Sequence, residues 1–184
     1  MSKIPKQAKK VFSGEIFDVY QWPQKMYDGS TANFEMIKRA NTALIIPILE
    51  DKILMIEEQQ PGKKYDHTLV GGRQEKNETI LACAKREFLE ETGLTGKLIF
   101  CGVNHKTDFS KQGELLEDKI FFVFKATNLK GSFVEQFQGG KNIWLSLAQI
   151  KKLDKLFPDV LDKIKLLEGK REFFSEKQYF VDEF

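Results

Sequence analysis

Residues 71–94 read GGRQEKNETILACAKREFLEETGL, and they constrain the fold of this 184-residue chain more than any other stretch. No Gly or Pro occurs over residues 79–92, and Gly93 then supplies a residue that readily ends a helix. Asn77 is expected to cap the helix N-terminus, with Glu78 in the first turn. The stretch therefore predicts a helix of about three to four turns that begins and ends near glycines.

Acidic residues gather on one side of this predicted helix. Glu87, Glu90 and Glu91 are three and four residues apart, so their carboxylates share a face. Like charges at this spacing are destabilising unless a cation lies among them, and Arg86 is expected to neutralise part of the cluster, chiefly through Glu90. Carboxylates without His or Cys favour Mg²⁺ or Mn²⁺ over Zn²⁺. A solvated acidic face is the alternative that a charge run alone would suggest.

The spacing of these residues resembles the signature sequence of the Nudix hydrolases. That signature is Gly, five residues, Glu, seven residues, Arg-Glu, an apolar residue, any residue, Glu-Glu, any residue, Gly and an apolar residue. It is matched from Gly72 to Leu94 at every defining position, and the broader resemblance covers roughly residues 40–156. It implies hydrolysis of a pyrophosphate bond in a nucleoside diphosphate linked to another group, with bound divalent ions neutralising the phosphates and activating a water.

The resemblance also assigns roles to individual positions. Glu87 and Glu91 match the principal metal ligands, and Glu90 matches an adjacent acidic position that can also contact metal. The backbone carbonyl of Gly71 matches the group that completes the metal shell. Arg86 matches the residue that orients the glutamates through salt bridges.

The general base is expected outside this signature. In many members of the family a glutamate on a later loop contacts both metal and water. Glu117 is the first candidate here and Glu114 the second, both in a predicted polar loop over residues 109–117. Exposed loop acids without a catalytic role are the alternative. Glu78, near the junction of loop and helix, is expected to be structural.

The rest of the chain reads mainly as strands. They are predicted at residues 11–22, 34–39, 42–49, 52–56, 67–70, 97–103, 120–126 and 142–145, and further helices at 146–156 and 158–167. This order predicts an α/β or α+β sandwich. The resemblance implies a Nudix-type α/β/α sandwich with a mixed sheet and an N-terminal antiparallel strand extension. The aromatic tail after residue 168 is expected to pack on the domain or on a partner.

Composition bounds the class of protein. Hydrophobic residues make up 41% of the chain, enough for a packed core, and the formal net charge of +2 supplies no strong field to recruit nucleic acid. No apolar N-terminal run and no stretch of membrane-spanning length are present. The two cysteines, Cys83 and Cys101, have no metal-binding spacing and are expected to be buried, reduced thiols. A cytoplasmic protein that binds neither nucleic acid nor membrane is expected.

Residues 1–40 resemble the N-terminal strands of the branch that hydrolyses ADP-ribose and other nucleoside diphosphate sugars, and residues 41–184 form the expected Nudix domain. In that branch these strands form a homodimer and help to build the nucleotide pocket. Tyr20 or Trp22 would then stack on a base, and Arg39 would contact phosphate or ribose. Packing in the core or dimer interface is the alternative for both aromatic side chains.

Two departures from the branch bear on the substrate. Residues 57–60 read EEQQ where an Arg-Gln-Tyr-Arg-like stretch is common, and Val70 replaces a proline. The first change removes cations that would contact phosphate or ribose, so nucleotide sugars other than ADP-ribose are also candidate substrates. A nucleoside diphosphate sugar is the favoured substrate, giving a nucleoside monophosphate and a sugar phosphate. The alternatives are hydrolysis of nucleoside triphosphates, dinucleoside polyphosphates or capped RNA, and a non-catalytic nucleotide-binding module.

Overall fold

The computed structural model describes residues 4–14, 17–58, 66–113, 115–168 and 174–181, with the backbone alone for 115–117, 168 and 174–181. The chain divides into two compact units, Met1–Ala40 and Asn41–Phe184.

The N-terminal unit is a three-stranded antiparallel sheet. Its strands, in spatial order, are β1 (Lys9–Ser13), β2 (Phe17–Lys25) and β3 (Thr31–Arg39). The predicted single strand over residues 11–22 is wrong because Gly14 interrupts it, and the N–H of Gly14 donates to the carbonyl of Phe17 (3.0 Å). In the turn between β2 and β3, the N–H of Ser30 donates to the Asp28 carboxylate (2.8 Å).

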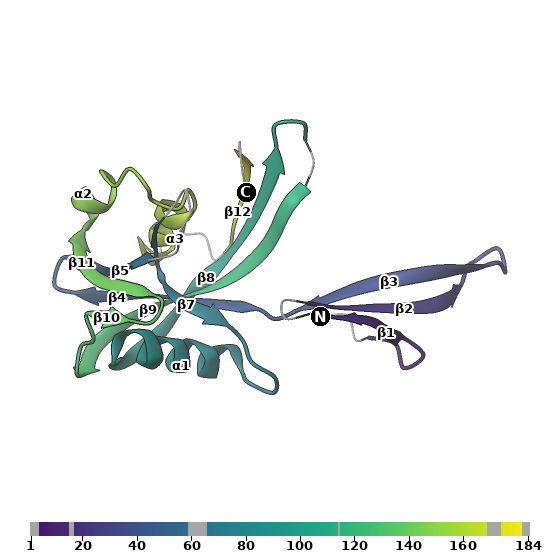
Figure 1. The fold of residues 1–184 in the computed structure, drawn as a ribbon, viewed down its shortest axis with the longest axis horizontal. Coiled ribbons are helices and arrows are strands. Elements are labelled where there is room, and N and C mark those ends of the chain that lie inside the picture. Colours follow the sequence, from purple (N-terminus) through teal and green to yellow (C-terminus); the bar gives the residue numbers. More distant parts are fainter. Residues whose placement is uncertain (1–3, 15–16, 59–65, 114, 169–173, 182–184) are drawn as a thin grey trace. The chain divides into compact units, whose positions relative to one another are not determined.

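The second unit is built on a mixed sheet that has nine strands among the described residues (Figure 1). These are β4 (Thr42–Leu49), β5 (Lys52–Glu58), β6 (His67–Thr68), β7 (Val70–Arg73), β8 (Leu94–Ser110), β9 (Leu115–Gly131), β10 (Gln136–Phe137), β11 (Gly140–Ser146) and β12 (Phe174–Val181). The main order is β10-β11-β5-β4-β9-β8-β12, while β6 pairs with β5 and β7 with β4. The pairs β4–β9 and β8–β12 are parallel, which makes the sheet mixed.

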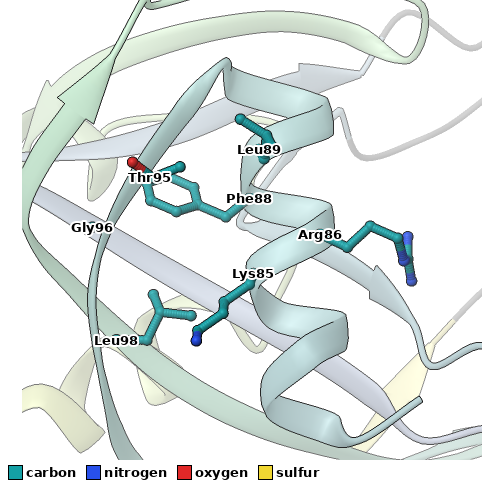
Figure 2. A pocket seen from close by; sticks show the side chains of 7 residues that line it. All are labelled: Lys85, Arg86, Phe88, Leu89, Thr95, Gly96 and Leu98. Carbon is teal, nitrogen blue, oxygen red and sulfur yellow. The ribbon is translucent and has the colours of Figure 1, made fainter.

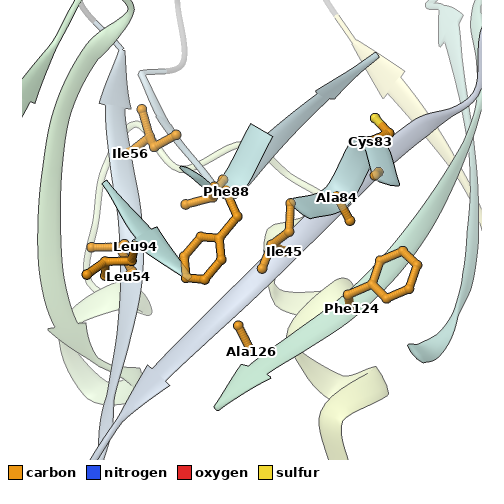
Figure 3. Close-up of a cluster of buried hydrophobic side chains, with 11 residues drawn as sticks. Ile45, Leu54, Ile56, Cys83, Ala84, Phe88, Leu94, Phe124 and Ala126 are labelled. Carbon is orange, nitrogen blue, oxygen red and sulfur yellow. The ribbon is translucent and has the colours of Figure 1, made fainter. Parts of the chain in front are cut away.

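Helices cover both faces of this sheet (Figure 1). On one face lies α1 (Ile80–Thr92), whose Phe88 packs in a buried cluster with strand residues such as Ile45 (Figure 3). On the other lie α2 (Leu147–Ile150), α3 (Val160–Lys165) and the 3-10 helix η1 (Leu166–Glu168). Leu44 faces the second cluster, with Ile164 of α3, because successive strand residues point to opposite faces. The α/β/α sandwich with a mixed sheet is confirmed.

The ends of α1 are set by local sequence. Gly93 is in the left-handed region (φ 70°) and its N–H donates to the carbonyl of Leu89 (2.8 Å), so the predicted C-terminal stop is confirmed. The expected N-cap, Asn77, is wrong. Asn77 has a φ of 66° in the preceding turn, and the Thr79 side chain caps the helix by accepting from the N–H of Ala82 (3.1 Å).

The longest strands form one hairpin, β8–β9, of 17 residues each. The predicted polar loop over residues 109–117 is wrong, since β8 continues to Ser110 and β9 resumes at Leu115 around a short turn. Pairing of Thr107 with Asp118 and of Asp108 with Glu117 extends the ladder. The prediction failed because polar residues form strands readily when a neighbouring strand satisfies their backbone hydrogen bonds.

Both C-terminal helices are shorter than predicted. Ser146 caps α2 as expected, with a capping box to Gln149. The helix predicted over residues 146–156 nevertheless ends after one turn. The carbonyl of Lys155 accepts from the N–H groups of Asp66 (3.0 Å) and His67 (3.2 Å), and the N–H of Phe157 donates back to His67 (3.1 Å). These bonds to the start of β6 replace the helical ones.

The remaining features concern the tail and the cysteines. The backbone of β12 pairs in parallel with β8, so this part of the aromatic tail packs on the second unit. Cys83 is buried and Cys101 half-buried, and both are free thiols. In the described part of the chain, every helix falls short of the length and apolar character needed to cross a membrane.

Candidate active site

Arg86, in the middle of α1, is the centre of an ionic network. Its guanidinium binds both carboxylate oxygens of Glu78, through Nε (3.0 Å) and Nη2 (3.1 Å). Nη1 donates to Glu87 (2.8 Å) and to Glu90 (3.1 Å), and Nη2 also donates to the carbonyl of Arg73 (3.0 Å). The guanidinium thereby holds the pKa of Glu78 below its usual value. The planar guanidinium of Arg86 therefore links the loop before the helix to two carboxylates on the helix.

The carboxylate of Glu87 lies directly against the backbone of Gly72. A Cβ at Gly72 would collide with this carboxylate, so the first glycine of the signature leaves room for an acidic side chain. Burial raises the pKa of Glu87, while the hydrogen bond from Arg86 opposes that rise. The glycine and the glutamate are fifteen positions apart in sequence but lie against each other in the fold.

Glu91 is the most strongly perturbed acid of the site. Its Oε2 accepts a hydrogen bond from the backbone N–H of Gly71 (2.9 Å), which has a φ of 145° that glycine tolerates best. Burial, together with the negative charges of Glu87 and Glu58, raises the pKa of Glu91 to about 7, against the lowering effect of the Gly71 hydrogen bond. Glu91 is thus a half-buried carboxylate surrounded by other acids.

The predicted metal ligands fit a divalent cation in their chemistry. Buried carboxylates of like charge are unfavourable until a cation neutralises them, and an all-oxygen set suits Mg²⁺ or Mn²⁺. Among the described side chains, no three acids, histidines or cysteines converge on one point. Glu90 is largely exposed and bonds to Arg86. The assignment of Gly71, Glu87, Glu90 and Glu91 as ligands stays a prediction.

The backbone of the first candidate base, Glu117, lies toward the far end of the β8–β9 hairpin. Glu114 is outside the described residues, as is the side chain of Glu117. The backbone of Glu117 is five residues from Phe122, which lies beside β4 at the level of Gly72. That separation is roughly 16 Å along the strand. The hairpin end lies on the opposite side of the sheet from α1 in Figure 1, and the role of either glutamate as base stays a prediction.

The predicted substrate contacts all belong to the N-terminal unit. Trp22 is buried against Phe34, with ring centroids 6.1 Å apart, and its indole N–H donates to Gln24 (3.1 Å). Tyr20 lies beneath the ammonium of Lys10, 5.7 Å from the ring centroid. This packing of Trp22 agrees with the alternative to base stacking, which was packing in the core or the dimer interface. Stacking by Tyr20 or Trp22 and a phosphate contact by Arg39 stay predictions.

Two residues near the site were missed by the sequence reasoning. Glu58, at the end of β5, lies close enough to Glu91 to raise its pKa. Asn142, on β11, donates to the backbone carbonyl of Glu91 (2.7 Å). Neither lies in the signature sequence: Glu58 is on β5 and Asn142 is on β11, and these two strands pair with each other.

A pocket of about 390 Å³ lies between α1 and the start of β8 (Figure 2). Lys85 and Phe88 point from the helix toward β8, whereas Arg86 points the other way. None of the predicted metal ligands is among the described residues that line this pocket, although Arg86 is one of them.

Comparison with known proteins agrees with this fold and site. The NUDIX domain family model matches residues 38–167. The curated ADP-ribose pyrophosphatase of Bacillus subtilis (strain 168) is 29% identical over 93 residues, which are 48% of this chain and 49% of that protein. The chain therefore aligns with about half the length of this relative. The match confirms the resemblance to the ADP-ribose branch seen in the sequence.

Solved structures are similar over a larger share of the chain. A MutT protein from Bacillus halodurans superposes with a TM-score of 0.61 and 25% identity, covering 77% of this chain and 90% of the other. A structure described as an ADP compounds hydrolase gives a TM-score of 0.56 and 18% identity, covering 91% and 95%. At that identity the second match shows the fold alone. It is too long to lie within Asn41–Phe184, so it includes part of the N-terminal unit.

The matched span of the family model contains the whole signature helix, the central strands of the sheet and the helices on its other face. The chain belongs to the Nudix family.

Proposed function

We propose that the protein is a metal-dependent Nudix pyrophosphohydrolase that cleaves the pyrophosphate bond of a nucleoside diphosphate sugar. The products are a nucleoside monophosphate and a sugar phosphate. The similarity to an ADP-ribose pyrophosphatase supports this substrate class. The EEQQ sequence at residues 57–60 argues for testing nucleotide sugars other than ADP-ribose as well.

One observation carries the proposal: Glu87 and Glu91, both with raised pKa values, lie against Gly72 and Gly71. In the proposed site these two carboxylates, Glu90 and the carbonyl of Gly71 hold Mg²⁺ or Mn²⁺. The ion supplies neutralisation of the phosphates and a bound water of lowered pKa.

The chain's own residues hold this site in place. Arg86 restrains Glu87 and Glu90 through its guanidinium, and its bond to Glu78 fixes the guanidinium in turn. A restrained carboxylate loses little further freedom on ligand binding, which favours tight, correctly oriented binding. Glu117, or Glu114 in its place, would take the proton from the attacking water.

The N-terminal unit would contribute substrate binding as part of a homodimer. Large apolar side chains are exposed on its sheet: Val11, Phe12, Phe17, Phe34 and Ile37. Exposed apolar side chains grouped on one small sheet favour association with another surface. Tyr20 or Trp22 would stack on the base and Arg39 would bind phosphate or ribose.

The test is a product-resolved substrate screen with Mg²⁺ and with Mn²⁺. It compares ADP-ribose, other nucleotide sugars, nucleoside triphosphates and dinucleoside polyphosphates. A nucleoside monophosphate together with a sugar phosphate is the expected result. Pyrophosphate release from triphosphates as the main activity would reject the substrate class. Nucleotide binding without turnover of any substrate would instead favour a non-catalytic module.

A further inference from the structure

Asn142 connects β11 directly to the last turn of α1. Its side chain is buried, and its Nδ2 donates to two backbone carbonyls, those of Glu91 (2.7 Å) and Val134 (2.8 Å). Its own backbone N–H donates to the carbonyl of Glu135 (2.8 Å). One amide group therefore joins the helix, the segment before β10 and the sheet.

The hydrogen bond from Asn142 to Glu91 lies in the last turn of α1, where a helix has the fewest hydrogen bonds of its own. The last four carbonyls of a helix lack partners within it and depend on outside donors. In α1 the carbonyl of Leu89 receives the N–H of Gly93 (2.8 Å), and the carbonyl of Thr92 receives the N–H of Val134 (2.9 Å). Asn142 supplies the donor for Glu91 itself. Asn142 thereby anchors the backbone of Glu91 to β11 of the sheet.

The orientation of the Asn142 side-chain amide is unfavourable for its oxygen atom. With Nδ2 directed at two carbonyls, Oδ1 of Asn142 is buried and has no hydrogen-bond partner among the described residues. A buried acceptor that is left unpaired lowers the stability of the folded state. The opposite orientation of the amide would place its oxygen against the two carbonyls, so the observed one is the only one that bonds to Glu91.

We propose that Asn142 is a positioning residue for the Glu91 carboxylate, which it keeps against Gly71 by holding the backbone of the last helical turn. This inference rests on the proposed role of Glu91 as a metal ligand. Asn142 touches neither substrate nor metal in this proposal. Its loss frees the turn, so the Glu91 carboxylate samples positions outside the site before the ion binds.

The test measures Mn²⁺ binding to the substrate-free protein by calorimetry and, separately, the Mn²⁺ dependence of turnover. Asn142→Ala removes both donors, and Asn142→Ser keeps one hydroxyl donor if the alanine variant does not fold. Asn104→Ala is the matched control, because Asn104 is also fully buried but pairs with Phe121 on the α3 side of the sheet. Glu91→Gln is the reference for a lost ligand.

Removing a group that orients a metal ligand typically weakens metal affinity by about 10–100-fold. We expect that change in the Mn²⁺ dissociation constant for Asn142→Ala, a smaller one for Asn142→Ser and none for Asn104→Ala. Turnover at saturating Mn²⁺ should stay close to that of the wild type. An unchanged dissociation constant in both Asn142 variants, with wild-type binding intact, overturns this inference alone. Absence of Mn²⁺ binding by the wild type overturns the metal role of Glu91 and this inference with it.

Discussion

Replacing Glu91 with glutamine should stabilise the metal-free protein at neutral and alkaline pH. The pKa of Glu91 is raised to about 7 from an ordinary value of 4.5, chiefly by burial. The folded state therefore binds this proton more tightly than the unfolded state does. Ionising the carboxyl costs stability, and this loss develops as the pH rises from about 4.5 to about 7 and is complete above that range.

The size of the effect follows from the two pKa values. At about 1.36 kcal/mol for each unit of pKa, the difference between 4.5 and about 7 corresponds to a cost of up to about 3 kcal/mol. Glutamine has nearly the same shape, does not ionise and can still accept the hydrogen bond from Gly71 through its amide oxygen. For a domain of this size, 3 kcal/mol raises the melting temperature by roughly 6–12 °C.

The assay is thermal unfolding of wild type and Glu91→Gln in EDTA, at pH 5 and at pH 8. The variant should melt higher at pH 8, with a much smaller difference at pH 5. Adding Mg²⁺ at 1,000 times its dissociation constant should then reverse the order at pH 8, because a ligand at that excess stabilises the wild type by about 4.1 kcal/mol, which exceeds the cost of ionising Glu91. A variant that melts lower than the wild type at pH 8 in EDTA, or a difference that is equal at both pH values, would refute the reasoning.

Three further outcomes are expected. Arg86→Lys cannot form the paired bonds to Glu78 and should lower kcat/KM by about 10–100-fold; full activity would show that the network is dispensable. Gly72→Ala should collide with the Glu87 carboxylate and weaken Mn²⁺ binding about tenfold or more, and calorimetry giving a wild-type constant would contradict the contact. Ile37→Lys adds a charge at a position that is 65% exposed on β3 and should convert the proposed dimer to a monomer. Light scattering that still finds a dimer would exclude this face as the interface.

The chemistry of the site could be predicted from the sequence because its acidic residues lie on one helix. The spacing of Glu87, Glu90 and Glu91 follows the helical repeat, and Gly93 ends the helix through its own backbone freedom. The central strand was equally clear, since a continuous apolar run over residues 42–49 suits a strand buried on both faces. Each of these features depends on interactions between near neighbours in the chain.

Features that depend on distant partners were mispredicted or missed. The polar residues 109–117 read as a loop, and the ladder between β8 and β9 made most of them strand. The helix predicted over residues 146–156 ends early because Lys155 bonds to Asp66 and His67. The N-cap of α1 was mispredicted for a local reason, since the turn before the helix places Asn77 in the left-handed region and Thr79 caps the helix instead.

The sequence by itself determined the family, the sandwich of helices on a mixed sheet and the acidic helix. Only the tertiary structure decided the electrostatic state of the site. The raised pKa of Glu91 comes from burial and from Glu58, 33 residues away, and the anchoring of its backbone comes from Asn142, 51 residues away. Burial and long-range hydrogen bonds arise when separate elements pack, so no local spacing of residues encodes them.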